Sequence, residues 1–322
     1  MTHGQATAMY GEVRRYTVRR DPERLYELDS GVAVPEGAVL LYHLDGFVDA
    51  GSAGEALTEH LRAEFDEDRV LARFDVDRLI DYRSRRPVMT YSADHWSDYE
   101  PPELAVRLLH DTDGTPFLLL SGPEPDHEWE LFTTAVRELI ERWQVRLSVN
   151  YHGIPMGVPH TRPLGITAHA TRSELVRGYR ATYSQMQIPG SAAALLEYRL
   201  GQAGHDAVGF AAHVPHYLAQ SRYPAAAITL LDAVSSAAGI TVSSEAIRES
   251  AHSADEEVER QVRENEEIAD VVTALERQYD AFSAVEPEEN LLADVDEMPT
   301  ADELASQFEQ FLSEQRRDQG EN

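Results

Sequence analysis

The sequence contains no cysteine among its 322 residues. Disulfide bonds, thiolate metal sites and cysteine nucleophiles are therefore excluded, and a reducing compartment is the expected environment. Lysine is also absent, because all 28 of the Lys and Arg positions are arginine. This second absence excludes enzymes that need a lysine, as a Schiff base, as an anchor for pyridoxal phosphate or within a phosphate-binding loop.

Positive charge is scarce and long apolar runs are missing. The formal net charge of -29 would repel a phosphate backbone or an anionic lipid surface, so we expect neither nucleic-acid nor membrane binding. No apolar run approaches the roughly 20 residues of a membrane span. Residues 1–20 also lack the apolar block of a secretory signal. Together these features predict a cytoplasmic protein.

The negative charge is unevenly distributed along the chain. Residues 241–322 hold 24 Asp and Glu but only 6 Arg. Such an asymmetry indicates a distinct C-terminal unit. We therefore expect an α/β domain with an N-terminal lead-in over residues 1–242, and an acidic helical region over residues 243–322.

Apolar periodicity predicts a three-layer α/β fold. Short apolar runs alternate with helical patterns, which is typical of a mixed sheet covered by helices on both faces. The expected strands are 38–44, 69–74, 87–92, 105–110, 116–121, 145–151, 164–170 and 207–213. The expected helices are 52–65, 129–143, 191–202, 223–238, a long stretch at 244–282 that forms one helix or two, and a last one from Thr300, where Thr300 and Glu303 are spaced as a capping box.

The first candidate ligand site is the glycine-rich turn at 45–54, which follows a predicted strand and precedes a predicted helix. A turn of this kind presents backbone N–H groups to an anion. The candidate residues are Asp45, Gly46, Asp49, Gly51 and Ser52. The alternative is a purely structural turn in which Asp49 or Ser52 caps the helix.

The second candidate is the segment 152–162, expected to be a loop after a strand. His152, His160 and Arg162 offer a base and an anion-binding guanidinium. Because parallel strands direct their carboxyl ends to one crevice, we expect this loop and the 45–54 turn to form a shared site. The alternative is a rigid crossover whose histidines bond the backbone. Together with His213 and His216, these histidines could bind a metal, but Pro215 interrupts the spacing and no HExxH pattern occurs, so we expect neither a metal nor another cofactor.

Four segments together carry a family resemblance: 44–54 (LDGFVDAGSAG), 75–87 (DVDRLIDYRSRRP), 150–163 (NYHGIPMGVPHTRP) and 298–312 (MPTADELASQFEQFL). In order and spacing they resemble the proteasome assembly chaperone 2 family, in its actinobacterial branch. The resemblance implies a fold similar to purine nucleoside phosphorylases and related hydrolases, with a C-terminal helical appendage. It also implies self-association, with a trimer as the first expectation, and a protein partner such as a proteasome component. A dimer is the second expectation, because dimers are the commonest oligomers.

Two functions follow as hypotheses. The first is a non-enzymatic, assembly-chaperone-like interaction protein. The second is a small-molecule-binding or hydrolase/phosphorylase-like enzyme with its pocket at the 45–54 and 152–162 segments. No G-x-S-x-G motif occurs, and the resemblance supplies no catalytic residue, so the catalytic set stays unknown and the first hypothesis is preferred. Fold alone does not distinguish the two, because one fold hosts many functions.

Overall fold

The computed structural model describes residues 21–29, 31–65, 69–179 and 185–283. The chain forms two compact units, residues 1–275 and 276–322, with the boundary inside the last described helix. The expected helix from Thr300 lies outside the described residues. The expected division at 242/243 stays a prediction about independent folding. None of the helices in the described ranges is both long and apolar enough to cross a bilayer.

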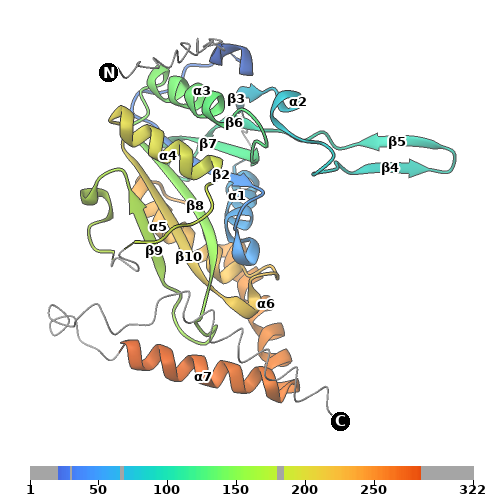
Figure 1. Cartoon of the computed structure of the whole chain (residues 1–322), viewed down its shortest axis with the longest axis vertical. Helices are drawn as coiled ribbons and strands as arrows, with labels where there is room; N and C mark the ends of the chain where they lie inside the picture. The colour runs from blue at the N-terminus through green and yellow to red at the C-terminus, as the bar shows by residue number, and fades with distance from the viewer. Residues whose placement is uncertain (1–20, 30, 66–68, 180–184, 284–322) are drawn as a thin grey trace, which may run out of the picture. The chain divides into compact units, whose positions relative to one another are not determined.

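The first unit is built on an eight-stranded mixed sheet (Figure 1). The strand order is β1-β3-β6-β7-β2-β8-β10-β9. The strands are β1 (Tyr26–Leu28), β2 (Val39–Asp45), β3 (Arg69–Phe74), β6 (Ala105–His110), β7 (Pro116–Pro123), β8 (Leu147–Met156), β9 (Ile166–Ala170) and β10 (Ala207–Pro215). The four central strands β7, β2, β8 and β10 run parallel, whereas the outer strands pair antiparallel. This arrangement confirms the predicted mixed sheet.

Helices cover both faces of the sheet. On one face, α1 (Ala53–Glu64) and α5 (Pro224–Ala238) pack against the odd-numbered apolar positions of β2, such as Leu41. On the other face, α3 (Trp129–Arg142) and α4 (Ala192–Ala203) pack against the even-numbered positions, such as Leu40. The apolar run of β2 is therefore buried on both sides, as expected for a central parallel strand.

The remaining elements connect these layers. They are the helical turns η1 (Pro22–Leu25), η2 (Ala50–Ser52), η3 (Ser173–Val176) and η4 (His216–Leu218), and the short helix α2 (Val76–Leu79). After the sheet come α6 (Glu245–Glu264) and α7 (Glu266–Ser283), so the long predicted helical stretch is two helices. Asn265, which separates them, accepts hydrogen bonds through its side-chain oxygen from the backbone N–H groups of Glu267 and Ile268. A side chain that caps the second helix in this way favours a break at this point.

A second, two-stranded sheet consists of β4 (Met89–Ser92) and β5 (His95–Tyr99). The two antiparallel strands form a hairpin that projects away from the eight-stranded sheet (Figure 1). The sequence predicted the first of these strands and missed the second. The polar residues of His95–Tyr99 hide its alternation, and a register shift between Thr90 and Tyr91 interrupts the pairing.

Candidate functional site

The 45–54 turn is organised by the carboxylate of Asp49. Its Oδ1 accepts hydrogen bonds from the backbone N–H groups of Gly54, at 2.9 Å, and Gly153, at 2.7 Å. Its Oδ2 accepts from the N–H of Glu55 at 3.0 Å. Asp49 therefore caps α1 and also ties the turn to β8. Three backbone donors at this site, those of Gly54, Glu55 and Gly153, therefore already hold a carboxylate of the protein itself.

Close backbone approach explains the glycines of this region. Gly51 has a φ of 69° and hydrogen-bonds Ala219 and Tyr223 through its own N–H and carbonyl. A Cβ atom on Gly153 would lie 2.1 Å from the carbonyl oxygen of Ala50. Ser52 also lies in the left-handed region, at a φ of 47°, and makes no side-chain cap. The cap is thus Asp49, one of the two residues that the structural alternative named.

His43 lies beneath the turn and is almost fully buried. Its Nδ1 donates to the carbonyl of Tyr151 at 3.1 Å. Its Nε2 lies 3.1 Å from Asp45 Oδ1 and 3.7 Å from Asp49 Oδ2. Burial lowers the pKa of His43, but the carboxylates of Asp45 and Asp49 outweigh it, so the pKa is above its ordinary value. Sequence reasoning missed His43, since it stands inside an apolar run.

His152 lies on the opposite face of the sheet, next to a second histidine. Burial, followed by the nearby charge of His169, lowers the pKa of His152 to about 4. His169 is bound by Glu197 of α4, with Nδ1 and Oε1 2.8 Å apart. Burial lowers the pKa of His169, but Glu197 outweighs it and raises the pKa above its ordinary value. The pKa values of these two histidines are therefore shifted in opposite directions.

The expected loop 152–162 is partly a strand, which corrects the sequence prediction. β8 continues to Met156 because each residue from 148 to 156 has a parallel partner on β10, ending with Met156 opposite Pro215. The backbone N–H of Gly153 in this strand donates to the Asp49 carboxylate, so the turn and the start of the segment do adjoin. The predicted contact is present here, while ligand binding at it stays a prediction.

His160 and Arg162 lie beyond the end of β8, in different surroundings. The backbone N–H of His160 donates to the hydroxyl of Tyr217 at 2.8 Å, and its ring Nδ1 lies 2.6 Å from the same oxygen. Arg162 bonds the carbonyl and hydroxyl of Thr161 at 3.3 and 3.4 Å. The predicted residues are thus not all brought together. The turn around Asp49 contacts β8, His152 lies on the opposite face of the sheet, and His160 contacts Tyr217 of η4.

The guanidinium of Arg85, which precedes the hairpin, lies against Gly46. Arg85 donates to the carbonyl oxygens of Asp45 and Glu124 and pairs with Asp126 at 2.8 Å. A Cβ on Gly46 would lie 2.9 Å from this guanidinium. Arg85 therefore fixes the hairpin base to the ends of β2 and β7.

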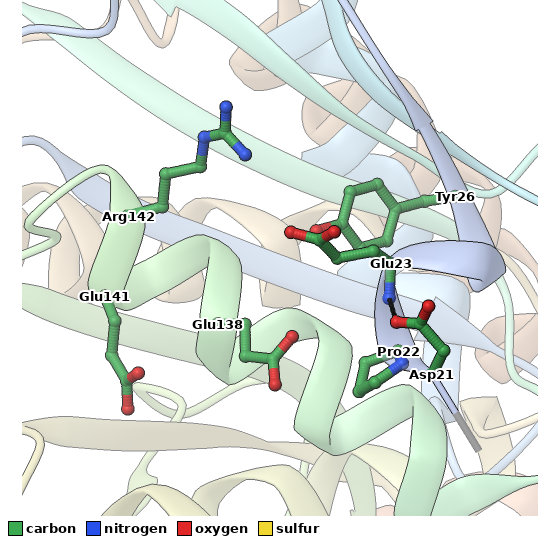
Figure 2. Close-up of a pocket in the computed structure, with 7 residues that line it drawn as sticks. All are labelled: Asp21, Pro22, Glu23, Tyr26, Glu138, Glu141 and Arg142. Carbon is green, nitrogen blue, oxygen red and sulfur yellow. Dashed lines mark hydrogen bonds between the residues drawn. The ribbon is translucent and has the colours of Figure 1, made fainter. Parts of the chain in front are cut away.

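A cavity of about 610 Å³ opens on the surface between η1 and α3 (Figure 2). Four of its seven lining residues are acidic and one is basic; they are Asp21, Pro22, Glu23, Tyr26, Glu138, Glu141 and Arg142. It contains none of the predicted site residues.

Within the described ranges, no group of three or more His, Asp or Glu side chains is placed to hold a metal ion.

The hairpin has one apolar face that is exposed to solvent. Met89 pairs with Tyr99, and Tyr91 with Trp96, whose ring centroid lies 5.1 Å from that of Tyr91. Residues directly opposite each other, and residues two apart, share one face of a strand pair. These four residues, called the apolar hairpin face below, are 43 to 63% exposed.

Sequence comparison places the chain in a family. The sequence profile of the PAC2 family matches residues 43–262, which is more than half of the chain. The chain belongs to the PAC2 family. This confirms the resemblance inferred from the four sequence segments. No curated protein matches the sequence significantly.

Solved structures of related proteins share the fold. A Mycobacterium tuberculosis protein of unknown function, Rv2714, is 46% identical, with 80% of this chain and 90% of that one covered and a TM-score of 0.77. A protein of unknown function from Corynebacterium glutamicum is 37% identical, covering 81% and 99%, with a TM-score of 0.78. The M. tuberculosis proteasome-assembly chaperone homologue Rv2125 is 24% identical, covering 73% and 99%, with a TM-score of 0.67. At that identity the likeness to Rv2125 shows the fold alone.

Proposed function

We propose that this chain is a non-enzymatic, assembly-chaperone-like protein of the cytoplasm that self-associates and binds a protein partner such as a proteasome component. The observation that carries the proposal is the apolar hairpin face. Soluble proteins rarely leave contiguous aromatic surface in water unless another protein covers it. Tyr and Trp are also enriched where protein interfaces are strongest.

The geometry of the predicted ligand site supports an interaction protein over an enzyme. An oxyanion or phosphate site needs backbone donors that are free to meet substrate. Here the N–H groups of Gly54 and Glu55 in α1, and of Gly153 in β8, are bound by Asp49. An added anion would have to displace a carboxylate that also joins α1 to β8.

The likeness to Rv2125, described as a proteasome-assembly chaperone homologue, supports the choice of partner. The net charge of -29 adds a physical constraint, since a strongly acidic chain binds neutral or basic protein surfaces most readily. Self-association as a trimer or as a dimer is part of the same proposal.

The test uses the full chain and purified proteasome α- and β-type subunits from the same organism. We expect a complex with at least one subunit type by sedimentation, and faster formation of the assembled particle on native gels. Trp96→Ser should weaken the complex. Tyr198→Ser, which alters an aromatic residue of similar exposure on α4, is the matched control and should leave it unchanged. Absence of any complex at tens of micromolar protein would refute the proteasome partner.

A further inference from the structure

The cavity between η1 and α3 lies outside the site described above and carries an excess of carboxylates. Asp21 and Glu23 lie on its η1 side, and Glu138 faces them from α3 (Figure 2). None of these three carboxylates forms an ion pair with another described residue. Arg142, the one basic residue that lines the cavity, lies farther along α3. The part of the cavity next to η1 is therefore negatively charged and has no cation of its own.

Two titratable groups of the cavity are affected by this negative charge. The pKa of Glu138 is raised, and burial is the largest cause. Arg137 opposes the shift, whereas three neighbouring carboxylates add to it, those of Glu23, Glu141 and Asp21. Burial also raises the pKa of Tyr26, and the charges of Glu23 and Glu138 act in the same direction. A cation in the cavity would relieve the repulsion among these groups.

The arrangement of the carboxylates favours an extended organic cation over a metal ion. Among the described residues, no three His, Asp or Glu side chains converge to hold a metal. The volume of about 610 Å³ lies within the range of roughly 300–1,000 Å³ that is usual for sites of small organic groups. Pro22 and the ring of Tyr26 add apolar wall. An arginine side chain suits such a site, because its guanidinium pairs with carboxylates and stacks on aromatic rings while its stem covers apolar surface.

Arginine side chains of this kind occur in the sequence immediately before the cavity. Residues 13–20 (VRRYTVRR) contain four arginines and no acidic residue. Because a chain advances at most about 3.6 Å per residue, the Cα of Arg19 is within roughly 7 Å of the Cα of Asp21. A tether this short gives its end an effective concentration in the millimolar range. These arginines therefore compete well against free cations for the same carboxylates.

We propose that the cavity between η1 and α3 binds the chain's own basic segment, residues 13–20, with Arg19 and Arg20 paired with Glu23 and Glu138. This intramolecular contact is separate from the proposed function and uses no residue of the apolar hairpin face. It neutralises an acidic surface that would otherwise bind basic segments of other proteins. The segment thus excludes unrelated basic partners from this surface by occupying it first.

The first experiment measures, by calorimetry, how a synthetic peptide of residues 13–20 binds to the full chain. In one variant, called the quadruple variant, four arginines are changed to Gln: Arg14, Arg15, Arg19 and Arg20. The peptide should bind the quadruple variant at least tenfold more tightly than the native chain, where the segment already occupies the cavity. Adding Glu138→Gln to the quadruple variant should weaken peptide binding severalfold. Adding Glu27→Gln is the matched control, because Glu27 is an exposed carboxylate of β1 outside the cavity, and should leave binding within twofold.

Three results of this experiment would overturn the proposal. Equal peptide binding to the native chain and the quadruple variant would show that the segment does not occupy the cavity. No peptide binding to the quadruple variant would show that the cavity does not recognise the segment. Spermine that binds the native chain as tightly as the quadruple variant would identify a free polyamine as the occupant instead.

The second experiment uses the absence of lysine from the sequence. In Arg19→Lys or Arg20→Lys, the introduced amine is the single lysine, and a carbodiimide joins it to a carboxylate with which it is in contact. Mass spectrometry of the single-chain band from a denaturing gel should find it linked to Glu138. That link decides the test, because Glu23 is close in sequence and would be reached in any case. High salt should lower the yield.

The same cross-linking carries its own control. Glu138→Gln in the lysine variants should abolish the link to position 138, whereas Glu27→Gln should leave it in place. A single-chain product without a link to Glu138 refutes the contact. A link to Glu138 found mainly between two chains overturns the intramolecular arrangement, since it places the segment in the cavity of another copy.

Discussion

The turn after β2 and the β4–β5 hairpin differ in where their side chains find partners. At the strand ends, the carboxylate of Asp49 meets three backbone N–H groups of the same chain, and His43 meets a carbonyl and two carboxylates. At the hairpin, aromatic rings face water. The first region resembles a ligand site in sequence, but its hydrogen bonds join α1 to β8 within the chain. The second region was only half predicted from the sequence, and it carries the exposed aromatic side chains on which the proposed function rests.

The largest expected effect on stability comes from removing the carboxylate of Asp49. Asp49→Ala leaves three backbone donors without their acceptor in a region where the carboxylate is only 16% exposed. We expect a loss of about 3 kcal/mol in the free energy of unfolding. Urea titration followed by circular dichroism at pH 7 measures it. Asp45→Ala, whose side chain is 56% exposed, is the control and should cost at most about 1 kcal/mol. Equal losses in the two variants would contradict the capping role.

The second effect is a pH dependence from His152. Its pKa of about 4 in the folded chain lies below the ordinary value of 6.5. Between these values the unfolded chain binds a proton that folded His152 does not, so stability falls as pH falls from 6.5 towards 4. The loss should be about 2 kcal/mol. Unfolding free energies at several pH values should therefore depend less steeply on pH in His152→Gln than in the native chain.

His43 should change the pH dependence of folding stability in the opposite direction to His152. Its pKa is raised in the folded chain, so its contribution to stability is fully present below pH 6.5 and is lost as pH rises through the folded pKa. His43→Gln should remove the loss of folding stability that occurs as pH rises. His152→Gln should remove the loss of folding stability that occurs as pH falls. If both substitutions changed the same limb of the profile, the two assignments of charge state would be wrong.

The smallest effect on stability is expected at the hairpin. Trp96 is 63% exposed, so Trp96→Ser should change the free energy of unfolding by no more than about 0.5 kcal/mol. The measurement belongs at a concentration where the chain is dissociated, because self-association would add to the apparent stability. A loss comparable to that of Asp49→Ala would mean that the hairpin is part of the core, and the contrast between the two regions would disappear.

The parts of the fold that sequence predicts are those determined locally. Apolar runs such as Val39–Leu44 mark central strands, and Gly204, just after the predicted helix 191–202, closes α4 in the left-handed conformation that favours glycine. The parts that sequence misses depend on distant neighbours. His152 belongs to a strand because β10 pairs with it. Asp49 rather than Ser52 caps α1 because Gly153, 104 residues away, also donates to it.

The candidate site shows the same limit. The sequence places Asp49 and the start of the 152–162 segment correctly at one sheet edge, because parallel strands bring their carboxyl ends together. It gives no way to know that the carboxylate of Asp49 binds the N–H groups of Gly54 and Gly153. It also gives no reason to single out His43 within an apolar strand, or His169 and Glu197, whose pairing depends on how α4 lies over β9.

The central position of β2 has a consequence for synthesis of the chain. β2 lies between β7 and β8, so its apolar residues obtain their second strand partner only when β8 has left the ribosome. About a hundred residues separate the two strands. At a synthesis rate of about 5–20 residues per second, β2 is without its β8 partner for roughly 5–20 s. A protein proposed to assist assembly would therefore itself pass through an interval in which an exposed strand invites association with the wrong chain.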